Sequence, residues 1–254
     1  MALAPDRLDR FARQIILPEI GGAGQVALAN AHVALVGLGG IGSPALQYLA
    51  GAGVGRFTLI DDDGVSASNL QRQMLYGEGD VGAPKRAKAA AWLREFDRQL
   101  EVETFGEHVD AGSAGRAIAG ADLVLDGTDN FATRLAVSDA CVAAGIPLLS
   151  AAVARFQGQV AAFAGHRAEE PCYRCFVGDA FDADDCDTCA ENGILGAMAG
   201  WVGSFAAMQA IRVLLDGHAG FGDPQWGRLH ILDGIVPGMK TIRIAKDPDC
   251  RVCG

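Results

Sequence analysis

The sequence predicts an α/β protein whose sheet is doubly wound and mostly parallel, with antiparallel strands added near the carboxyl end. Three observations predict this fold class. Short β-rich segments alternate with helical segments through the first 150 residues, which is typical of a parallel sheet covered by helices. A glycine-rich turn, Gly37 to Gly42, joins the first strand to a helix. In the second half the alternation ends and strand segments follow one another.

Length and composition favour one large folded domain. The chain has 254 residues and half of them are hydrophobic, which is enough to bury a sizeable core. The formal charge of −10 argues against nucleic acid and membrane surfaces as partners, because both require clustered Lys and Arg. No apolar export segment follows the first residues, so we expect a cytoplasmic protein.

Two short helices are expected ahead of the glycine-rich turn. Apolar spacing predicts them at residues 8–17 and 25–31, on either side of a break at residues 21–24. Residues 32–37 then predict a buried strand, and the next helix ends near residues 51–55.

Strands and helices continue to alternate up to residue 153. The strands are expected at residues 56–60, 101–105, 121–130 and 145–153, and the helices at residues 85–96 and 132–144. Pro84 is expected to open the first of these helices, because proline suits the first position of a helix.

The second half contains a long loop between strand segments. Residues 158–163 predict an antiparallel strand, and residues 165–191 predict a Cys- and Asp-rich loop, long enough to suggest a function. Two strands at residues 228–232 and 240–244 are expected to close the fold.

An apolar, glycine-spaced helix is expected between that loop and the last strands, at residues 193–215. Gln209 and Arg212 interrupt it at helical spacing. We therefore expect a buried helix rather than a membrane span.

The glycine-rich turn carries the first sign of function. Residues 37–42 fit G-x-G-x-x-G between a strand and a helix, the Rossmann-like arrangement in which backbone N–H groups meet phosphates. Asp61 lies 19 residues beyond Gly42, at the end of the next strand, where a carboxylate reaches ribose hydroxyls. These features alone describe an NAD enzyme as well as an ATP enzyme.

Charged residues beyond the turn favour ATP. Arg72 and Lys85 could neutralise charge on a triphosphate, and Asp129, at the end of a later strand, could hold Mg²⁺. An NAD-dependent oxidoreductase, the alternative, does not need these cations. The simplest other interpretation of the three residues is surface charge.

Five motifs, GLGGIG, DDD, SNLQRQ, VGAPK and DGTDN, follow in this order. In order and spacing they resemble the MoeB/ThiF family, relatives of the ubiquitin-activating enzymes, from about Arg10 to the last residue. The resemblance implies a homodimeric enzyme that uses ATP and Mg²⁺ to adenylate the C-terminal Gly-Gly carboxylate of a small ubiquitin-like sulfur-carrier protein and releases pyrophosphate. A non-catalytic partner subunit is the alternative, but relatives of that kind lose the arginine or aspartate that this sequence retains.

The expected nucleotide-binding residues lie in the glycine turn and in the four other motifs. They are Gly37, Gly39, Gly40, Gly42, Asp61, Asp63, Ser68, Asn69, Arg72, Gln73, Lys85, Asp129 and Asn130. Simpler interpretations stay open for some of them. Asp63, like Asp62, could be only a turn residue at the end of a strand, and Asn69 and Gln73 could only cap a turn.

A catalytic arginine is expected from the N-terminal helix. Residues 10–14, Arg-Phe-Ala-Arg-Gln, resemble a family motif of the R-Y-x-R-Q type, in which an arginine crosses the dimer interface to the neighbour's triphosphate. By position the resemblance gives this role to Arg13, beside Arg72, Lys85 and Asp129 as catalytic residues. Phe11 replaces the usual tyrosine, so any role of that hydroxyl is absent.

Seven cysteines in a chain without an export signal indicate metal binding or catalysis before disulfides. Cys172 and Cys175 form one CxxC pair and Cys250 and Cys253 another, which together predict a structural four-sulfur Zn²⁺ site. Two unrelated thiol pairs are the alternative.

The remaining cysteines have different expectations. Cys141 is expected to be a buried small hydrophobe. Cys189, in Thr188-Cys189 ahead of Gly193, matches a cysteine that links covalently to the carrier in some relatives; for this chain the resemblance leaves a covalent role or none open.

We expect one ThiF/MoeB-type domain over residues 1–254, with N-terminal helices (5–31), a nucleotide-binding core (32–150) and a carrier-binding, zinc-containing part (151–254). Residues 154–159, Ala-Arg-Phe-Gln-Gly-Gln, are similar to the MoeB branch. This favours the molybdopterin synthase small subunit as the carrier; a thiamine-pathway carrier is the alternative. No sulfurtransferase domain follows Gly254, so a separate protein is expected as the sulfur donor.

Overall fold

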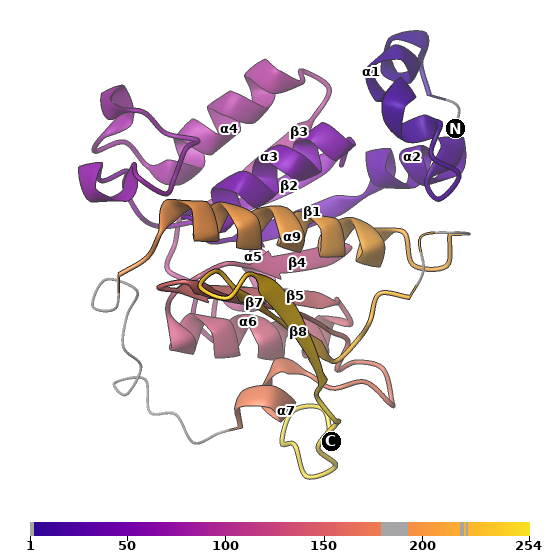
Figure 1. Ribbon diagram of the computed structural model, residues 1–254, viewed down its shortest axis with the longest axis vertical. Coiled ribbons are helices and arrows are strands. Elements are labelled where there is room, and N and C mark those ends of the chain that lie inside the picture. The colour runs from indigo at the N-terminus through magenta and orange to yellow at the C-terminus, as the bar shows by residue number, and fades with distance from the viewer. Residues whose placement is uncertain (1–2, 179–192, 219–220, 222) are drawn as a thin grey trace.

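The computed structural model describes residues 3–178, 193–218, 221 and 223–254. Its strands form one sheet, in the order β3-β2-β1-β4-β5-β6-β7-β8 (Figure 1). The strands are β1 (His32–Val36), β2 (Arg56–Ile60), β3 (Glu101–Phe105), β4 (Leu123–Asp126), β5 (Leu148–Ala154), β6 (Gln157–Phe163), β7 (Arg228–Asp233) and β8 (Gly238–Arg243). Strands β1 to β5 are parallel and β6 to β8 are antiparallel additions. The predicted fold class is confirmed.

Helices cover both faces of the parallel part. They are α1 (Pro5–Ile15), α2 (Gly21–Asn30), α3 (Gly42–Ala52), α4 (Lys85–Phe96), α5 (Ala114–Ala117), α6 (Phe131–Ala144), α7 (Tyr173–Val177) and α9 (Gly196–Leu214), with 3₁₀ turns η1 (Ala67–Asn69) and η2 (Glu78–Asp80). Val33 and Leu35 of β1 face the cluster made with α3, α4 and α9, whereas Ala34 and Val36 face the cluster made with α5 and α6. Burial on both faces explains why β1 is a continuous apolar run.

The strand order places the carboxyl ends of β1 and β4 at a topological switch point. From β1 the chain enters α3 on one face, and from β4 it enters α6 on the other (Figure 1). The register sets Val36 level with Ile60 and with Asp126. The residues that follow these three therefore meet at one edge of the sheet, where open α/β folds bind ligands.

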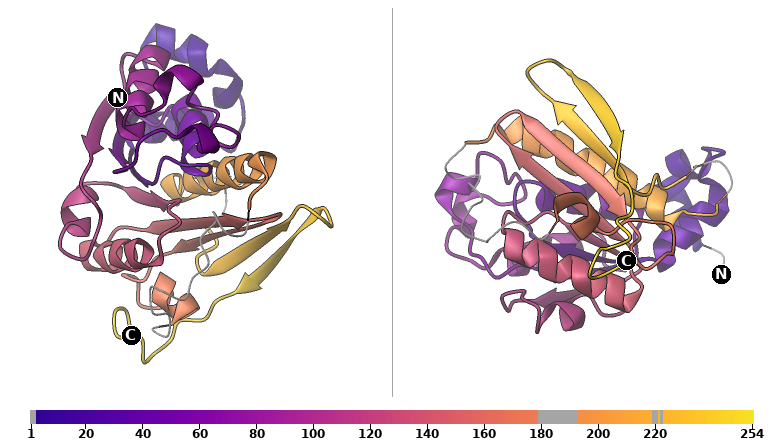
Figure 2. Two further views of the ribbon diagram at one scale, coloured as in Figure 1. Left: turned by 90° about the vertical axis from the view of Figure 1, so that its left-hand side faces the viewer. Right: turned by 90° about the horizontal axis from the view of Figure 1, so that it is seen from below.

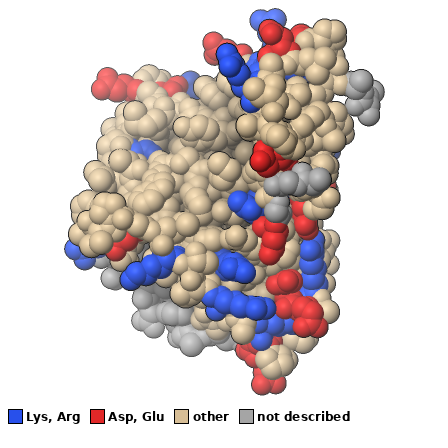
Figure 3. All heavy atoms as spheres, turned by 45° about the vertical axis from the view of Figure 1, so that its right-hand side comes forward, with Lys and Arg blue, Asp and Glu red and all other residues tan. Residues whose placement is uncertain are grey.

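Helix α9 is a core helix of the sheet's α3 face. It is, among the described residues, the one helix long and apolar enough to cross a membrane, yet half of it is buried inside the protein. It packs on α3, β5 and β6, and a Cβ at Gly203 would lie 2.6 Å from the Ile41 carbonyl oxygen. The predicted buried helix is confirmed. Its outer side exposes Trp201 and Met208. Figure 3 shows a broad area of the surface, left of centre, with few charged side chains.

The antiparallel strands end in a projecting hairpin. Figure 2 shows β7 and β8 extending beyond the rest of the sheet, and every residue of β8 is exposed. Ile235 and Val236, at the turn of this hairpin, are 70% and 72% exposed, so the hairpin offers apolar side chains to solvent.

Helix α1 is fixed to the end of α4 by charge. The buried Arg7 side chain pairs with Asp97, and the Arg10 guanidinium lies 4.6 Å from the centre of the Phe96 ring. Burial alone would raise the pKa of Asp97, but hydrogen bonds from Arg7 and from the Gln99 N–H hold it below its ordinary value. These contacts leave Arg13 on the exposed side of α1.

Three local predictions need correction. Helix α2 begins at Gly21 rather than after the glycine break, because the glycines form its first turn: the Gly24 N–H donates to the Ile20 carbonyl at 2.9 Å. Helix α7 lies within the segment predicted as a loop; the rest of that segment from residue 179 onward, including Cys186 and Cys189, lies outside the described residues. Helix α5 and the 3₁₀ turns were not predicted, because segments this short show no apolar period.

Candidate nucleotide-binding and metal sites

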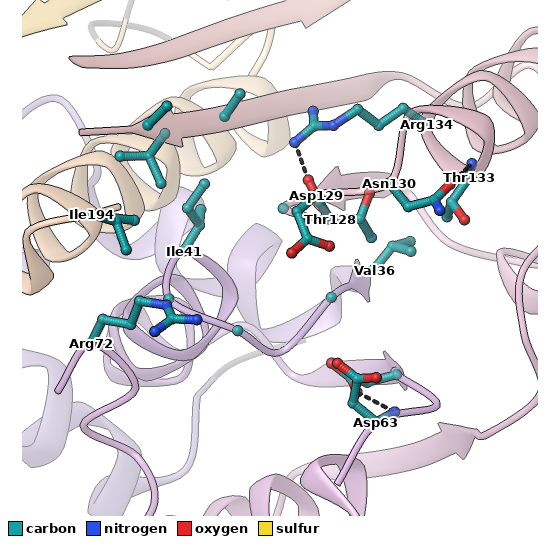
Figure 4. A pocket seen from close by; sticks show the side chains of 18 of the residues that line it. Val36, Ile41, Asp63, Arg72, Thr128, Asp129, Asn130, Thr133, Arg134 and Ile194 are labelled. Atoms are coloured by element: carbon teal, nitrogen blue, oxygen red, sulfur yellow. Dashed lines mark hydrogen bonds between the residues drawn. The ribbon is translucent and has the colours of Figure 1, made fainter. Parts of the chain in front are cut away.

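A cavity of about 1090 Å³ opens at the carboxyl ends of β1, β2 and β4 (Figure 4). Small-ligand sites usually measure about 300–1,000 Å³, so this one can hold a nucleotide and more. Of the expected nucleotide-binding residues, all except Gly42 and Ser68 line it. Their convergence supports the motif-based prediction, although their roles stay predictions.

The glycine turn brings the backbone close to itself at the start of α3. Gly37 has φ +83°, which favours glycine, and a Cβ at Gly42 would lie 1.9 Å from the Gly37 carbonyl oxygen. Gly42 therefore serves chain packing rather than ligand contact. Because Gly42 can approach the Gly37 carbonyl so closely, the amino end of α3 lies beside the cavity. Its free N–H groups there favour the binding of an anion.

Asp61 fastens this turn to the end of β2. One carboxylate oxygen accepts a 2.7 Å hydrogen bond from the Leu38 N–H and the other a 2.9 Å bond from the Asp63 N–H. Burial raises the pKa of Asp61, while the Lys85 charge and these two N–H groups act in the opposite direction. Asp61 lines the cavity, so the same carboxylate that shapes the turn is placed for the predicted ribose contact.

The two expected phosphate-binding cations are held by neighbouring side chains. Lys85 is buried, and its Nζ lies 2.7 Å from Asp63 Oδ2. Arg72 donates to Asn69 Oδ1 at 2.7 Å and to the Ser68 carbonyl at 3.1 Å. The two cations are thus positioned by Asp63, Asn69 and Ser68. Asp63 and Asn69 therefore do more than form turns.

The last two residues of the DGTDN motif, Asp129 and Asn130, have different surroundings. Asp129 is exposed and lines the cavity beside Thr128 (Figure 4), and its carboxylate has no hydrogen-bond or ion-pair partner among the described residues. Asn130 instead caps α6, its side-chain oxygen accepting from the Thr133 N–H at 2.9 Å. The free carboxylate is a suitable Mg²⁺ ligand; for Asn130 the observed task is structural.

The four predicted metal ligands form one cluster. Their Sγ atoms all lie within 4.8 Å of one another, and neighbouring pairs are 3.5–4.0 Å apart. A tetrahedral ion with Zn–S bonds of about 2.3 Å would set its sulfurs about 3.8 Å apart, so the cluster is compatible with zinc. The cluster joins α7 to the C-terminal tail, and the Asp247 N–H donates to Cys175 Sγ at 3.4 Å. Burial raises the pKa of Cys172, and a bound cation would offset that effect.

Two other sequence predictions can be placed. Cys141 is 2% exposed within α6, which confirms it as a buried small side chain. Arg13 does not line the cavity of its own chain, so it is not brought together with Arg72, Lys85 and Asp129.

Comparison with known proteins assigns the family. The ThiF family matches residues 11–252. The chain belongs to the ThiF family. It is 40% identical to the SAMP-activating enzyme E1 of Haloferax volcanii, over 100% of this chain and 92% of that protein. It is also 40% identical to the molybdopterin-synthase adenylyltransferase of Salmonella typhimurium, over 99% and 98% of the two chains.

The fold of this ThiF-family chain has counterparts among solved structures. One is the crystal structure of E. coli MccB with MccA-N7isoASN, at a TM-score of 0.82 and 20% identity, covering 97% of this chain and 74% of that one. This likeness supports the doubly wound fold with its antiparallel extension.

Arg134 is a residue of the site that sequence reasoning missed. It is buried in α6 and donates to the Thr128 carbonyl (Figure 4), to the Ala151 carbonyl at 2.8 Å and to Ser150 Oγ at 3.0 Å. On the other side of Thr128, Asp126 Oδ1 accepts from its N–H at 2.9 Å and its hydroxyl at 2.7 Å. Thr128 is held from both directions, and Asp129 beside it is placed accordingly. The available signal was an arginine one turn into a helix made mainly of apolar residues.

We predict that Arg134→Met lowers the free energy of unfolding by about 3–5 kcal/mol, because the buried Asp126 carboxylate, 3.9 Å from the guanidinium, would lose its compensating charge. Urea unfolding followed by circular dichroism measures the change. Arg116→Met is the matched control: Arg116 pairs with Glu107 in solvent, and its loss should cost less than about 1 kcal/mol. Equal costs for the two variants would contradict the prediction.

Proposed function

We propose that this ThiF-family chain is an adenylyltransferase that transfers AMP from ATP to the C-terminal Gly-Gly carboxylate of a small ubiquitin-like sulfur-carrier protein. One observation carries the proposal: a phosphate-binding glycine turn, two held cations and a free carboxylate line a single cavity. A hydride-transfer site would leave Arg72 and Lys85 without a task. The similarity to a molybdopterin-synthase adenylyltransferase over nearly both whole chains supports the same reaction.

The reaction needs positioning and charge stabilisation rather than a protein nucleophile. An oxygen of the carrier's carboxylate attacks the α-phosphorus, a new P–O bond forms, and the bond to the bridging oxygen breaks, so that pyrophosphate leaves with the electron pair. Gly40 and the amino end of α3 contact phosphate, Asp61 holds ribose, and Arg72 and Lys85 stabilise the developing charge. Mg²⁺, held by Asp129, would neutralise phosphate charge.

The carrier we favour is the small subunit of molybdopterin synthase, with a thiamine-pathway carrier as the alternative. Support comes from the Salmonella relative and from the sequence of residues 154–159. A separate sulfurtransferase as the sulfur donor and a cytoplasmic location remain predictions.

The proposed function predicts carrier-dependent exchange of pyrophosphate into ATP. Purified chain is assayed with the molybdopterin synthase small subunit or with a thiamine sulfur carrier, each with an intact Gly-Gly end, and with the same carriers lacking the last glycine. We expect exchange with the intact molybdopterin carrier only. Exchange with the thiamine carrier would reassign the pathway, and tight ATP binding without any exchange would contradict adenylation of either carrier.

We further propose that the enzyme is a homodimer in which Arg13 completes the partner's cavity. Arg13 is exposed, lies outside its own cavity and has no partner among the described residues. Helices α3 and α9, which pack together, expose Tyr48, Trp201 and Met208 by 61%, 38% and 51%. Large apolar side chains exposed on adjacent helices are typical of an interface.

Arg13→Ala should reduce exchange by about 10²- to 10³-fold without unfolding the protein, because one charge-stabilising group is lost from each site. Asp129→Ala should be inactive as well. Mixing and refolding the two variants together should restore about a quarter of wild-type activity, since half of the dimers would be mixed and each would own one intact site. If the mixture stays as inactive as its components, Arg13 does not act in trans.

We propose Zn²⁺ as the ion of the cysteine cluster, in a structural role, because a closed four-sulfur shell leaves no position for a substrate. Freshly purified protein should contain about one zinc per chain, measured by atomic emission. Cys253→Ser should lose most of this zinc and melt at a lower temperature, whereas Cys141→Ala, outside the cluster, should keep it. Equal zinc contents in the two variants would remove the assignment.

A further inference from the structure

The cavity extends beyond the part that a nucleotide would fill. Its second part is lined by residues 152–157, which comprise the end of β5, the β5–β6 turn and the start of β6, and by Ile194 and Ile235 from two other segments. Phe156 and Ile235 here are 40% and 70% exposed, so this part opens to solvent between apolar side chains. Its residues are not among those that hold ATP in the proposed reaction.

Arg155 occupies this second part in an unusual backbone conformation. Its φ is +52°, the left-handed region that disfavours residues with a side chain. The conformation is held by pairing with the segment before α9: the Arg155 N–H donates to the Gly193 carbonyl at 2.9 Å, and the Leu195 N–H donates to the Arg155 carbonyl at 3.4 Å. A positive φ is also what a two-residue hairpin turn favours, and Ala154 and Gln157 pair across this one. Turn and pairing together hold Arg155 in place at the cavity.

The Arg155 guanidinium differs from the other arginine and lysine side chains of the cavity. Lys85 is paired with Asp63, and Arg72 is hydrogen-bonded to Asn69. Arg134 is hydrogen-bonded to the Ala151 carbonyl. Arg155 is exposed and makes no side-chain hydrogen bond or ion pair with any part of the chain that the structure describes. Among the described residues, it is thus the cavity cation with all of its donors available to a ligand.

We propose that Arg155 binds the terminal carboxylate of the protein substrate and guides it to the α-phosphorus; the inference rests on the proposed function and adds a substrate-binding residue to it. A carboxylate that approaches a triphosphate is repelled, and a guanidinium on its path offsets the repulsion. The planar fork of arginine matches both carboxylate oxygens. Phe156 and Ile235 flank the extended chain end behind that carboxylate.

The test compares two forms of the molybdopterin synthase small subunit, one with its free C-terminal carboxylate and one with a C-terminal amide. Calorimetry gives the Kd of each form for the wild type, Arg155→Gln, Arg155→Gly and Arg155→Lys. Arg155→Gly is included because glycine accepts the positive φ, so a folding defect is not expected. Arg94→Gln, an exposed α4 arginine away from the cavity, controls for the loss of one charge. Pyrophosphate exchange gives the KM for carrier and for ATP.

We expect the wild type and Arg94→Gln to bind the carboxylate form at least about tenfold more tightly than the amide form. Arg155→Gln and Arg155→Gly should bind both forms equally and show a carrier KM raised by about tenfold, with the KM for ATP unchanged. Arg155→Lys should be intermediate. A merely structural role for Arg155 would not remove the discrimination between the two forms.

Two results would overturn the inference while leaving the proposed function intact. One is wild-type exchange activity with an undiminished carboxylate preference in the Arg155 variants. The other is a raised KM for ATP with an unchanged carrier KM, which would assign Arg155 to the triphosphate. Failure of the wild type to exchange with either carrier would be a different outcome, because it overturns the proposed function itself and the inference with it.

Discussion

The contact between Gly42 and the Gly37 carbonyl is the constraint on which the rest of the site depends. Because no Cβ fits there, the chain can leave β1 and enter α3 within one short turn. That turn sets the amino end of α3 at the sheet edge and lets Asp61 hold the Leu38 N–H. Through Asp61 the same turn is tied to Asp63 and hence to Lys85. The glycine turn, which we expect to bind phosphate, and Lys85 are therefore positioned together by one close approach of main chain to main chain.

The second half of the site is built by charge rather than by backbone shape. Burying Arg134 and Asp126 has a free-energy cost, which their hydrogen bonds to the Thr128 region offset. The result is a loop after β4 whose position is fixed from both sides although it has no regular secondary structure. A free carboxylate on such a loop can meet a hard cation with little further ordering, since the loop already occupies one conformation.

Much of this could be predicted from the sequence, and the exceptions share a cause. The alternation of strand and helix segments predicted β2 and β3 at their observed bounds. Strands that are buried or paired along their length show a clear pattern of residue types within the segment itself. The four cysteines and the glycine turn were found because their spacing is local too. Arg134 and Arg155 were missed as site residues: the significance of each comes from groups distant in sequence, Ala151 for the first and Gly193 for the second. Positive φ at a non-glycine residue leaves no mark in composition.

The cysteine cluster also bears on the order in which the molecule assembles. Cys172 and Cys250 are 78 positions apart, and α9, β7 and β8 lie between them. Closing a chain segment of that length costs conformational entropy, and the cost is smaller once α9 has packed on the sheet and the antiparallel strands have paired. An ion held by the four sulfurs would therefore bind most favourably to a chain whose second half is already assembled.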